Sequence, residues 1–318
     1  MKEAITDGKQ VEIIDSPIPA PGPDQVIIQV MASGCNPKDW KMPEMFTPGI
    51  NSGDDIAGVV YATGANVYEF KPGDRVAAFH ELQAPGGSFA EYAVALAVHD
   101  EASTIPLAAL TAFMGNYVHL GLPEPWKPAT EKLPFLVYGA ATAVGAFAIK
   151  LAWLSNIHPI IGAAGRGIPF AESLIDNQRA TDALRASGAA QLYHAFDAVV
   201  GNGSHTNVVE VLAPESRVTY VLPLELTAPP GFRYPDTYKA AGFTNVQDAY
   251  GANKQEGFIY LRWIFRMMME GKLTAHPHEV IPGGLAGVGQ ALQNLKSGKA
   301  SAVKYVFRVP ETEGAGQD

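Results

Sequence analysis

A turn of small residues in the middle of the chain has the composition that binds a pyrophosphate. Residues 135–138 are apolar and predict a short buried strand, and residues 144–154 predict an apolar helix. Small residues let the backbone approach phosphates, and the free N–H groups at a helix N-terminus favour an anion. The residues predicted to bind a dinucleotide here are Gly139, Ala140, Thr142, Ala143, Val144 and Gly145.

This turn alone leaves two interpretations open. The strict Gly-x-Gly-x-x-Gly pattern is missing, because Ala141 occupies the position of the second glycine. A small-residue turn also serves tight packing between a strand and a helix, with no ligand involved. The mid-chain position of the turn further requires a domain that precedes or encloses the dinucleotide-binding one.

The composition predicts a globular protein whose partner is neither nucleic acid nor a membrane. The 318 residues are 47% hydrophobic and 17% charged, and this length is typical of about two domains. A net charge of −9 without a basic run disfavours both polyanionic partners. No apolar stretch approaches the roughly 20 residues of a membrane span, and the N-terminus has no leader pattern. The single cysteine, Cys35, excludes an intrachain disulfide and fits the cytoplasm.

The order of the expected elements divides the chain into three parts. Residues 1–110 predict β-structure and the first part of one domain, residues 111–250 alternate strands and helices as in a parallel sheet, and residues 251–318 are expected to return to the first domain. After Pro310 we expect a frayed polar terminus. The expected strands are 26–30, 56–63, 70–77, 135–138, 158–164, 196–200, 217–222 and 302–309. The expected helices are 104–122, 144–154, 258–270 and 286–295.

Several sequence blocks in a fixed order resemble the medium-chain dehydrogenase/reductase superfamily. The resemblance is to its zinc-independent branch of quinone oxidoreductases and fungal trans-acting enoyl reductases, and it spans nearly the whole chain. It implies an α/β protein with an N-terminal GroES-like β-barrel domain, a doubly wound Rossmann domain, and a C-terminal return to the first domain. The blocks are Gly34–Lys41, Gly53–Gly58, Lys71–Val76, Gly87–Tyr92, Pro106–Ala112, His278–Gly284 and Gly298–Lys304.

The positions that correspond to zinc ligands in related alcohol dehydrogenases argue against a metal site. Asn36 falls where the first cysteine ligand would be, because Cys35 comes one position early, and Asp54 falls where the histidine would be. Asn and Asp do not replace a Cys/His/Cys set with good affinity for zinc. We therefore expect no metal in this protein.

The resemblance also indicates which residues act in the reaction. Lys41 would donate a hydrogen bond to a carbonyl or enolate oxygen, Asn36 would orient nicotinamide or substrate, and Thr111 would lie near the nicotinamide. The alternative for Lys41 is an ordinary surface lysine.

The cofactor expected from the second strand of the α/β part is NADPH. An NAD site places an acidic residue after this strand, whereas the stretch 162–167 has no acid and contains Arg166, which would pair with the 2′-phosphate. The alternative for Arg166 is a solvated loop residue. Leu222 and Pro223 resemble the family's backbone contact to the carboxamide.

The expected activity is reduction of an activated C=C bond, or of a quinone, by hydride transfer from NADPH. The substrate would be a small molecule, such as a polyketide-derived chain presented on a carrier protein, and the enzyme would be a monomer or a homodimer. A non-redox protein on the same scaffold, such as a cyclase or a cofactor-binding structural protein, is the alternative.

Two stretches depart from the family pattern. Between Tyr92 and Thr104 the family has a longer segment. Between Asp176 and Phe196 the family has a further strand and helix, where this sequence shows mainly residues 179–187.

Overall fold

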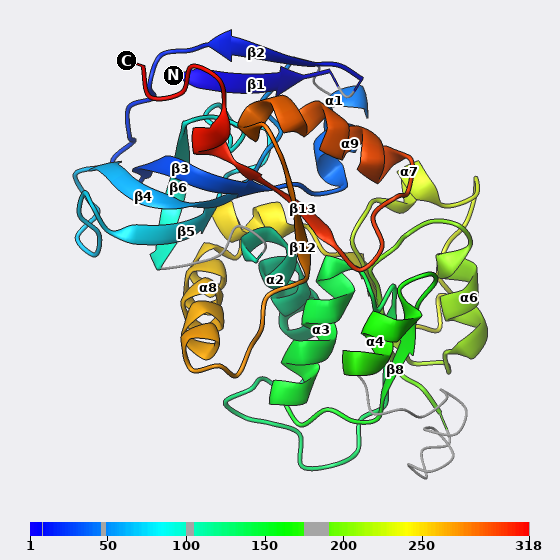
Figure 1. Ribbon diagram of the computed structural model, residues 1–318. Helices are drawn as coiled ribbons and strands as arrows, with labels where there is room; N and C mark the ends of the chain where they lie inside the picture. Colours follow the sequence, from blue (N-terminus) through cyan, green and yellow to red (C-terminus); the bar gives the residue numbers. More distant parts are fainter. Residues whose placement is uncertain (8, 46–48, 100–104, 175–190, 318) are drawn as a thin grey trace. The chain divides into compact units, whose positions relative to one another are not determined.

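The computed structural model describes residues 1–318 with the exception of 8, 46–48, 100–104, 175–190 and 318. The chain forms two compact units (Figure 1). The first unit consists of Met1–Leu107 and Ala249–Asp318, and the second unit is Ala108–Asp248. Each unit has a sheet of its own.

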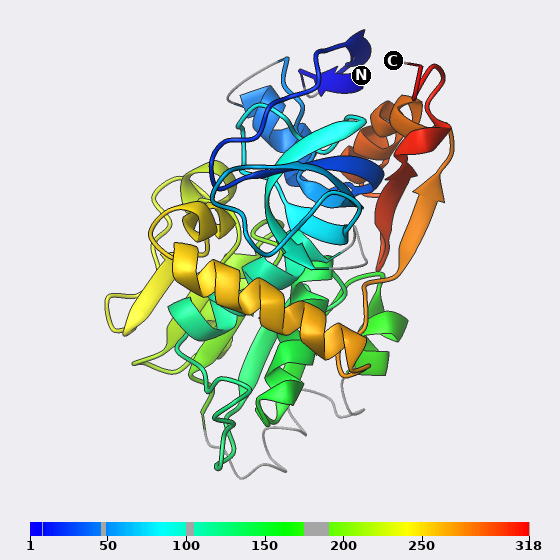
Figure 2. The same ribbon diagram turned by 90° about the vertical axis from the view of Figure 1, so that its left-hand side faces the viewer.

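The first unit is built on a six-stranded sheet that closes on itself. Its strand order is β12-β13-β3-β4-β5-β6, and β3 also pairs with β6, so that β3 to β6 form a small barrel. The parallel pair of β12 and β13 is visible in orange and red in Figure 2. A separate antiparallel hairpin joins β1 (Lys2–Thr6) to β2 (Val11–Asp15). The six strands are β3 (Val26–Gly34), β4 (Asp55–Thr63), β5 (Arg75–Phe79), β6 (Tyr92–His99), β12 (His278–Ile281) and β13 (Lys304–Arg308).

Alternate residues of the barrel strands form its apolar core. On β3, Val26, Ile28 and Val30 are buried, whereas Gln29 and Met31 are exposed. The sheet is tightly packed at Gly58, where an added Cβ would overlap the carbonyl of Gln29. The helices of this unit are α1 (Lys38–Met45), α8 (Lys254–Met269) and α9 (Val288–Lys296), with the 3-10 turns η3 (Gly284–Gly287) and η4 (Val309–Glu311).

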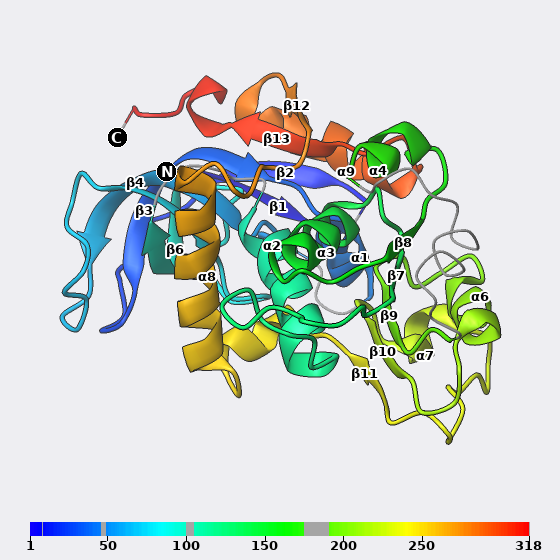
Figure 3. The ribbon, with the colours of Figure 1, turned by 90° about the horizontal axis from the view of Figure 1, so that it is seen from below.

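The second unit is a doubly wound parallel sheet. Its strand order is β11-β10-β9-β7-β8, with every neighbouring pair parallel. Figure 3 shows these strands side by side in the order of the sheet, with α3 on one face and α6 on the other. The strands are β7 (Phe135–Tyr138), β8 (Ile160–Ala163), β9 (His194–Asp197), β10 (Arg217–Tyr220) and β11 (Ala240–Phe243). The helices are α3 (Ala143–Leu154), α4 (Ile168–Leu174), α6 (Ser204–Val211) and α7 (Leu224–Thr227).

Two elements contain the boundaries between the units. The helix α2 (Pro106–Phe113) continues into a π-helix, η1 (Met114–His119), and the 3-10 helix η2 (Val246–Tyr250) contains the second boundary. In the π-helical segment, Asn116 is fully buried and its Nδ2 donates to the carbonyl of Ala148 on α3 (3.0 Å).

The structure corrects several local predictions. The strand expected at 70–77 begins only at Arg75, because residues 71–74 form a turn in which Lys71 N donates to Asp74 Oδ2. The end of the chain is not frayed through its described part. Thr312 is buried, and its Oγ1 accepts from Leu285 N and donates to Val309 O. The stretches at 100–104 and 175–190, where we expected departures from the family pattern, lie outside the described residues.

Candidate functional site

The glycine turn follows β7 directly, and its first residue needs to be glycine. Gly139 has φ +85°, and an added Cβ would overlap the side chain of Val199. The backbone N–H groups of Gly139 and Ala140 both donate to Ala163 O at the end of β8, at 2.8 and 2.9 Å. The turn is therefore held against the carboxyl ends of two neighbouring strands, which is where doubly wound sheets bind ligands.

The helix that follows begins with unpaired donors. Thr142 is the N-cap of α3, and its Oγ1 accepts from Gly145 N at 3.0 Å. A Cβ on Gly145 would overlap the carbonyl of Gly139, so the turn can fold this tightly only with glycine there. Among the described residues, nothing accepts from the N–H groups of Ala143 and Val144. The turn thus fits a pyrophosphate, because it combines close backbone access with free N–H groups at a helix N-terminus.

The other cofactor residues expected from the sequence lie at the carboxyl ends of strands in the same unit. Arg166 lies in an exposed turn after β8. Leu222 and Pro223 follow β10, and Pro223 is the N-cap of α7. The second unit therefore brings the glycine turn, Arg166 and the 222–223 pair to one edge of its sheet.

The loop after β9 at this edge is fixed by a buried carboxylate. Asp197 Oδ1 accepts from the N–H groups of Val199 and Val200, at 3.0 and 2.9 Å, and its Oδ2 accepts from Ser204 Oγ at 2.5 Å. The next residue, His205, is 2% exposed, and neither ring nitrogen has a hydrogen-bond partner among the described residues. Asp197 thus shapes the loop through hydrogen bonds rather than acting as a free charge.

In the first unit, the residue expected to orient a ligand is part of a buried network around Asp55. Asn36 Nδ2 donates to Asp55 Oδ2 at 2.7 Å, and Lys304 on β13 forms an ion pair with the same oxygen. Leu107 N, in the first turn of α2, donates to Asp55 Oδ1 at 2.7 Å. Lys304 and Asp55 are 3% and 0% exposed, so this is a fully buried ion pair with additional hydrogen bonds.

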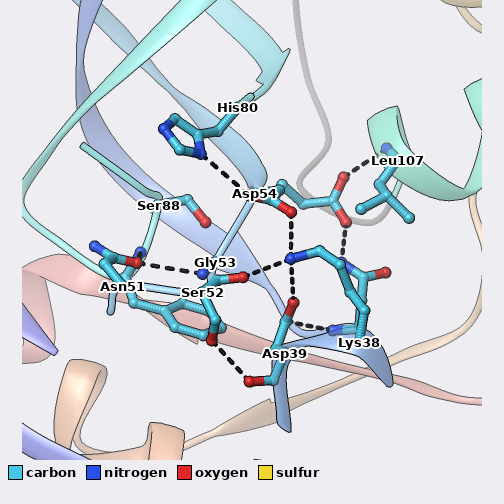
Figure 4. A network of polar contacts seen from close by, with 12 residues as sticks. Lys38, Asp39, Asn51, Ser52, Gly53, Asp54, His80, Ser88 and Leu107 are labelled. Carbon is cyan, nitrogen blue, oxygen red and sulfur yellow. Dashed lines mark hydrogen bonds and ion pairs between the residues drawn. The ribbon is translucent and has the colours of Figure 1, made fainter. Parts of the chain in front are cut away.

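A second charged network lies beside it and is centred on Lys38 (Figure 4). The ammonium forms ion pairs with Asp39 Oδ1 (2.8 Å) and with Asp54, and it donates to Ser52 O at 2.6 Å. Asp54 Oδ1 also contacts His80 Nδ1 at 3.1 Å, and His80 Nε2 contacts the carbonyl of Pro85 at 3.2 Å. Lys38 is the only member of this network with appreciable exposure among these described side chains, at 16%.

Burial and mutual charge set the protonation of this network. Desolvation raises the pKa of the Asp39 carboxyl, because it outweighs the attraction of Lys38 and because Asp54 adds a second negative charge. Desolvation alone would lower the pKa of Lys38, but the two carboxylates more than offset it and raise the pKa of this ammonium. Lys38 is therefore held as a cation between two acids.

Lys41 lies on α1 and is half-buried. Its Nζ lies 5.6 Å from the centre of the Trp40 ring, and among the described residues it forms no ion pair. Desolvation lowers the pKa of the Lys41 ammonium. This makes Lys41 a stronger acid than a solvated lysine. Thr111, the third residue expected in the reaction, is 5% exposed and lies on α2 in the second unit.

The residues that fall where related alcohol dehydrogenases have zinc ligands are engaged in other contacts. Asn36 and Asp54 are held by Asp55 and by Lys38, respectively, and the Cys35 thiol is buried, which raises its pKa well above the usual value. Within the described ranges, no group of three or more His, Cys, Asp or Glu side chains is arranged to hold a metal ion. Nor does any helix there combine the length and hydropathy needed to cross a membrane.

Sequence reasoning missed four residues of the first unit: Lys38, Asp55, His80 and Lys304. Lys38, Asp55 and Lys304 all lie within blocks that carried the family resemblance. The adjacent acids Asp54 and Asp55 were the available signal, because two neighbouring carboxylates beside an apolar strand need cations once they are buried.

Comparison with known proteins identifies relatives that cover most of the chain. Residues 22–106 match the family described as the alcohol dehydrogenase GroES-like domain. The trans-enoyl reductase fsr4 of Gibberella fujikuroi is 39% identical over 317 residues, which cover 90% of this chain and 92% of that protein. The trans-enoyl reductase resD of Aspergillus sclerotiorum is 29% identical over 350 residues, with 95% and 98% covered.

Solved structures share the fold. A putative zinc-dependent alcohol dehydrogenase from Rhizobium etli has a TM-score of 0.82 at 22% identity, covering 97% of this chain and 98% of that one. The CurK enoyl reductase has a TM-score of 0.77 at 18% identity, covering 96% and 98%. At these identities the likeness shows the fold alone. Together with the GroES-like match, it confirms the predicted α/β fold class.

Proposed function

The chain belongs to the medium-chain dehydrogenase/reductase superfamily, in the branch of the fungal trans-enoyl reductases, and on this premise we propose that it is an NADPH-dependent enoyl reductase. It would reduce an activated C=C bond by hydride transfer to the β-carbon. The observation that carries the proposal is the glycine turn, whose close backbone packing and free N–H groups at Ala143 and Val144 fit a dinucleotide.

The cofactor supplies the hydride when bound, and the protein holds and orients it. Residues 139–145 would bind its pyrophosphate. Arg166, exposed after β8 with no acidic residue in the stretch 162–167, supports NADPH over NADH because its guanidinium suits a 2′-phosphate. Leu222 and Pro223 would contribute backbone contacts to the carboxamide.

The protein's own chemistry would centre on the oxygen that gains negative charge. When hydride adds to the β-carbon, charge develops on the carbonyl oxygen of the substrate. Lys41 would donate a hydrogen bond to that oxygen, and its lowered pKa supports this role because a more acidic ammonium donates more strongly. Thr111 would lie near the nicotinamide, and Asn36 would orient a reactant.

We further propose that the reaction needs no zinc. The chemistry of the donors supports this, because Asn36 is a poor zinc ligand and Asp54 already forms an ion pair with Lys38. The substrate class follows from the relatives, which are trans-enoyl reductases by name. We propose a polyketide-derived enoyl chain, presented free or on a carrier protein.

The cofactor assignment is tested by binding. We expect NADPH to bind more tightly than NADH, and Arg166→Ala to weaken NADPH about 10-fold or more with little effect on NADH, since a charge-assisted hydrogen bond contributes about 1.5–3 kcal/mol. Arg233→Ala, which removes another exposed arginine of the same unit, is the control. Equal weakening of both cofactors by Arg166→Ala would contradict the assignment of Arg166 to the 2′-phosphate.

Turnover is tested with a panel of enoyl thioesters, enones and quinones. Oxidation of NADPH by enoyl compounds is the expected result. Tight NADPH binding with no oxidation by any member of the panel would contradict the reductase proposal and favour a non-redox role for the scaffold.

A further inference from the structure

Three oxygen atoms of the first unit converge on one point, and the ammonium of Lys38 fills it (Figure 4). They are Asp39 Oδ1 at 2.8 Å, Asp54 Oδ2, and the carbonyl oxygen of Ser52 at 2.6 Å. We call these three atoms the oxygen cage. An ammonium has three N–H donors, so each donor has one oxygen of the cage as its acceptor. Lys38 therefore has no donor left for a substrate or a cofactor.

Contacts outside the cage hold both carboxylates in this orientation. Asp39 Oδ2 accepts from Asn36 N at 2.7 Å, and Asp54 Oδ1 contacts His80 Nδ1 at 3.1 Å. Among the described residues, no hydrogen-bond donor other than Lys38 reaches Asp39 Oδ1 or Asp54 Oδ2. Each acid thus uses one oxygen to fix itself to the protein and directs the other at the ammonium.

The oxygen cage has the chemistry of a site for a divalent cation. Carboxylate and carbonyl oxygens are the ligands that Ca²⁺, Mg²⁺ and Mn²⁺ prefer in proteins. The distances of 2.6 and 2.8 Å from Lys38 Nζ are only a little longer than Ca–O bonds of about 2.3–2.6 Å. The side chains of Asp39 and Asp54 are 0% and 1% exposed, so they need a positive charge beside them. In this chain, Lys38 supplies that charge.

We propose that Lys38 is a built-in cation that occupies the place of a divalent metal ion and closes the oxygen cage to metal. It joins the start of α1 to the loop before β4 without any bound ion. The inference goes beyond the proposed function, because it holds whether or not the chain reduces an enoyl compound.

Removing the ammonium should turn the oxygen cage into a metal site. In Lys38→Ala the two carboxylates lose their cation, and the melting temperature of the full chain should fall by about 5 °C or more in metal-free buffer. Mn²⁺ should then bind with a dissociation constant on the order of 10⁻⁴–10⁻³ M, measured from the loss of the free ion's EPR signal. At saturation it should raise the melting temperature again by about 2 °C or more. The unaltered protein should show neither effect.

Lys304→Ala is the matched control. It also removes a buried lysine of the first unit, but it leaves a single carboxylate, Asp55, whose Oδ1 already accepts from Leu107 N. Its melting temperature should fall as well, and Mn²⁺ should not restore it. Lys38→Ala combined with Asp54→Asn should also show no effect of Mn²⁺, because one of the two charged ligands is gone.

Three results would overturn the inference. The first is a Lys38→Ala protein that gains neither folding nor stability from Mn²⁺, so that even a variant unfolded in metal-free buffer gives an answer. The second is equal stabilisation of Lys304→Ala by Mn²⁺, which would make the effect unspecific. The third is Mn²⁺ binding by the otherwise unaltered protein that Asp54→Asn abolishes. None of these results bears on the proposed function, which NADPH binding and turnover test separately.

Discussion

Removing the positive charge at Lys304 should strongly destabilise the protein. Lys304→Met keeps most of the side-chain volume but leaves Asp55 charged, 0% exposed and without its cation. Breaking a buried pair in this way costs about 3–5 kcal/mol of unfolding free energy, because desolvation of the remaining charge is no longer offset. The hydrogen bonds from Leu107 N and Asn36 to Asp55 would persist and keep the loss from being larger.

The same strand supplies a control. Arg308 also lies on β13, but its ion pair with Glu311 is exposed, at 63% and 42% of the two side chains. Arg308→Met should therefore cost less than about 1 kcal/mol. The assay is urea unfolding followed by circular dichroism, with unfolding free energies extrapolated to water.

A second variant separates the charge from the packing. Asp55→Asn added to Lys304→Met should recover part of the lost stability, since no unpaired charge remains buried. If Lys304→Met costs no more than Arg308→Met, or if the double variant is less stable than the single one, the reasoning about this buried pair is refuted.

Two further predictions concern the proposed reaction. Gly145→Ala should weaken NADPH binding about 10-fold or more, because the new Cβ would overlap the carbonyl of Gly139 and distort the turn. Gly242→Ala is the control and should bind NADPH normally in the same titration, because the atom nearest to its new Cβ is 3.9 Å away. If Lys41 acts as a protonated donor, the reduction rate should fall as the pH rises through its pKa, which burial lowers from the usual value of a lysine. Lys41→Arg should move that fall to higher pH, because a guanidinium stays protonated. An unmoved pH profile would contradict the role.

The sequence predicted those parts of the fold that depend on neighbouring residues. The strand over Phe135–Tyr138 and the helix after it appear as expected, because apolar runs and small residues act locally. The turn at residues 71–74 is also a local feature, but the apolar and β-favouring residues on either side of it led to the prediction of one strand over 70–77. Element boundaries of this kind are where local patterns are least decisive.

The buried networks could not be predicted from the sequence. Asp55 and Lys304 are 249 residues apart, and only the pairing of β13 with β3 brings the C-terminal strand to this part of the barrel. For the same reason the polar residues after Pro310 predicted a frayed terminus, although Thr312 is buried and accepts a hydrogen bond from Leu285 N. Polar residues that a sequence pattern assigns to the surface or to a free terminus can be buried and hydrogen-bonded once distant strands pair.

Of the candidate site, the sequence indicated the glycine turn and named Asn36 and Lys41 as candidates, but it predicted no helix over Lys38–Met45. It did not reveal that Asp55 holds the Asn36 amide, nor that Lys38 lies between Asp39 and Asp54. These contacts join α1 and its preceding loop to Asp54 and to the first residue of β4, and they depend on the barrel being assembled.

The central claim is that this chain transfers a hydride from NADPH to carbon. The most direct measurement is a reaction between an enoyl thioester and NADPH in which both C4 hydrogens are deuterium, with the product analysed by mass spectrometry and NMR. We predict a saturated product with one deuterium at its β-carbon and none at the α-carbon, where the proton comes from solvent. Recovery of unreduced substrate without deuterium, from protein that binds NADPH, would contradict the account.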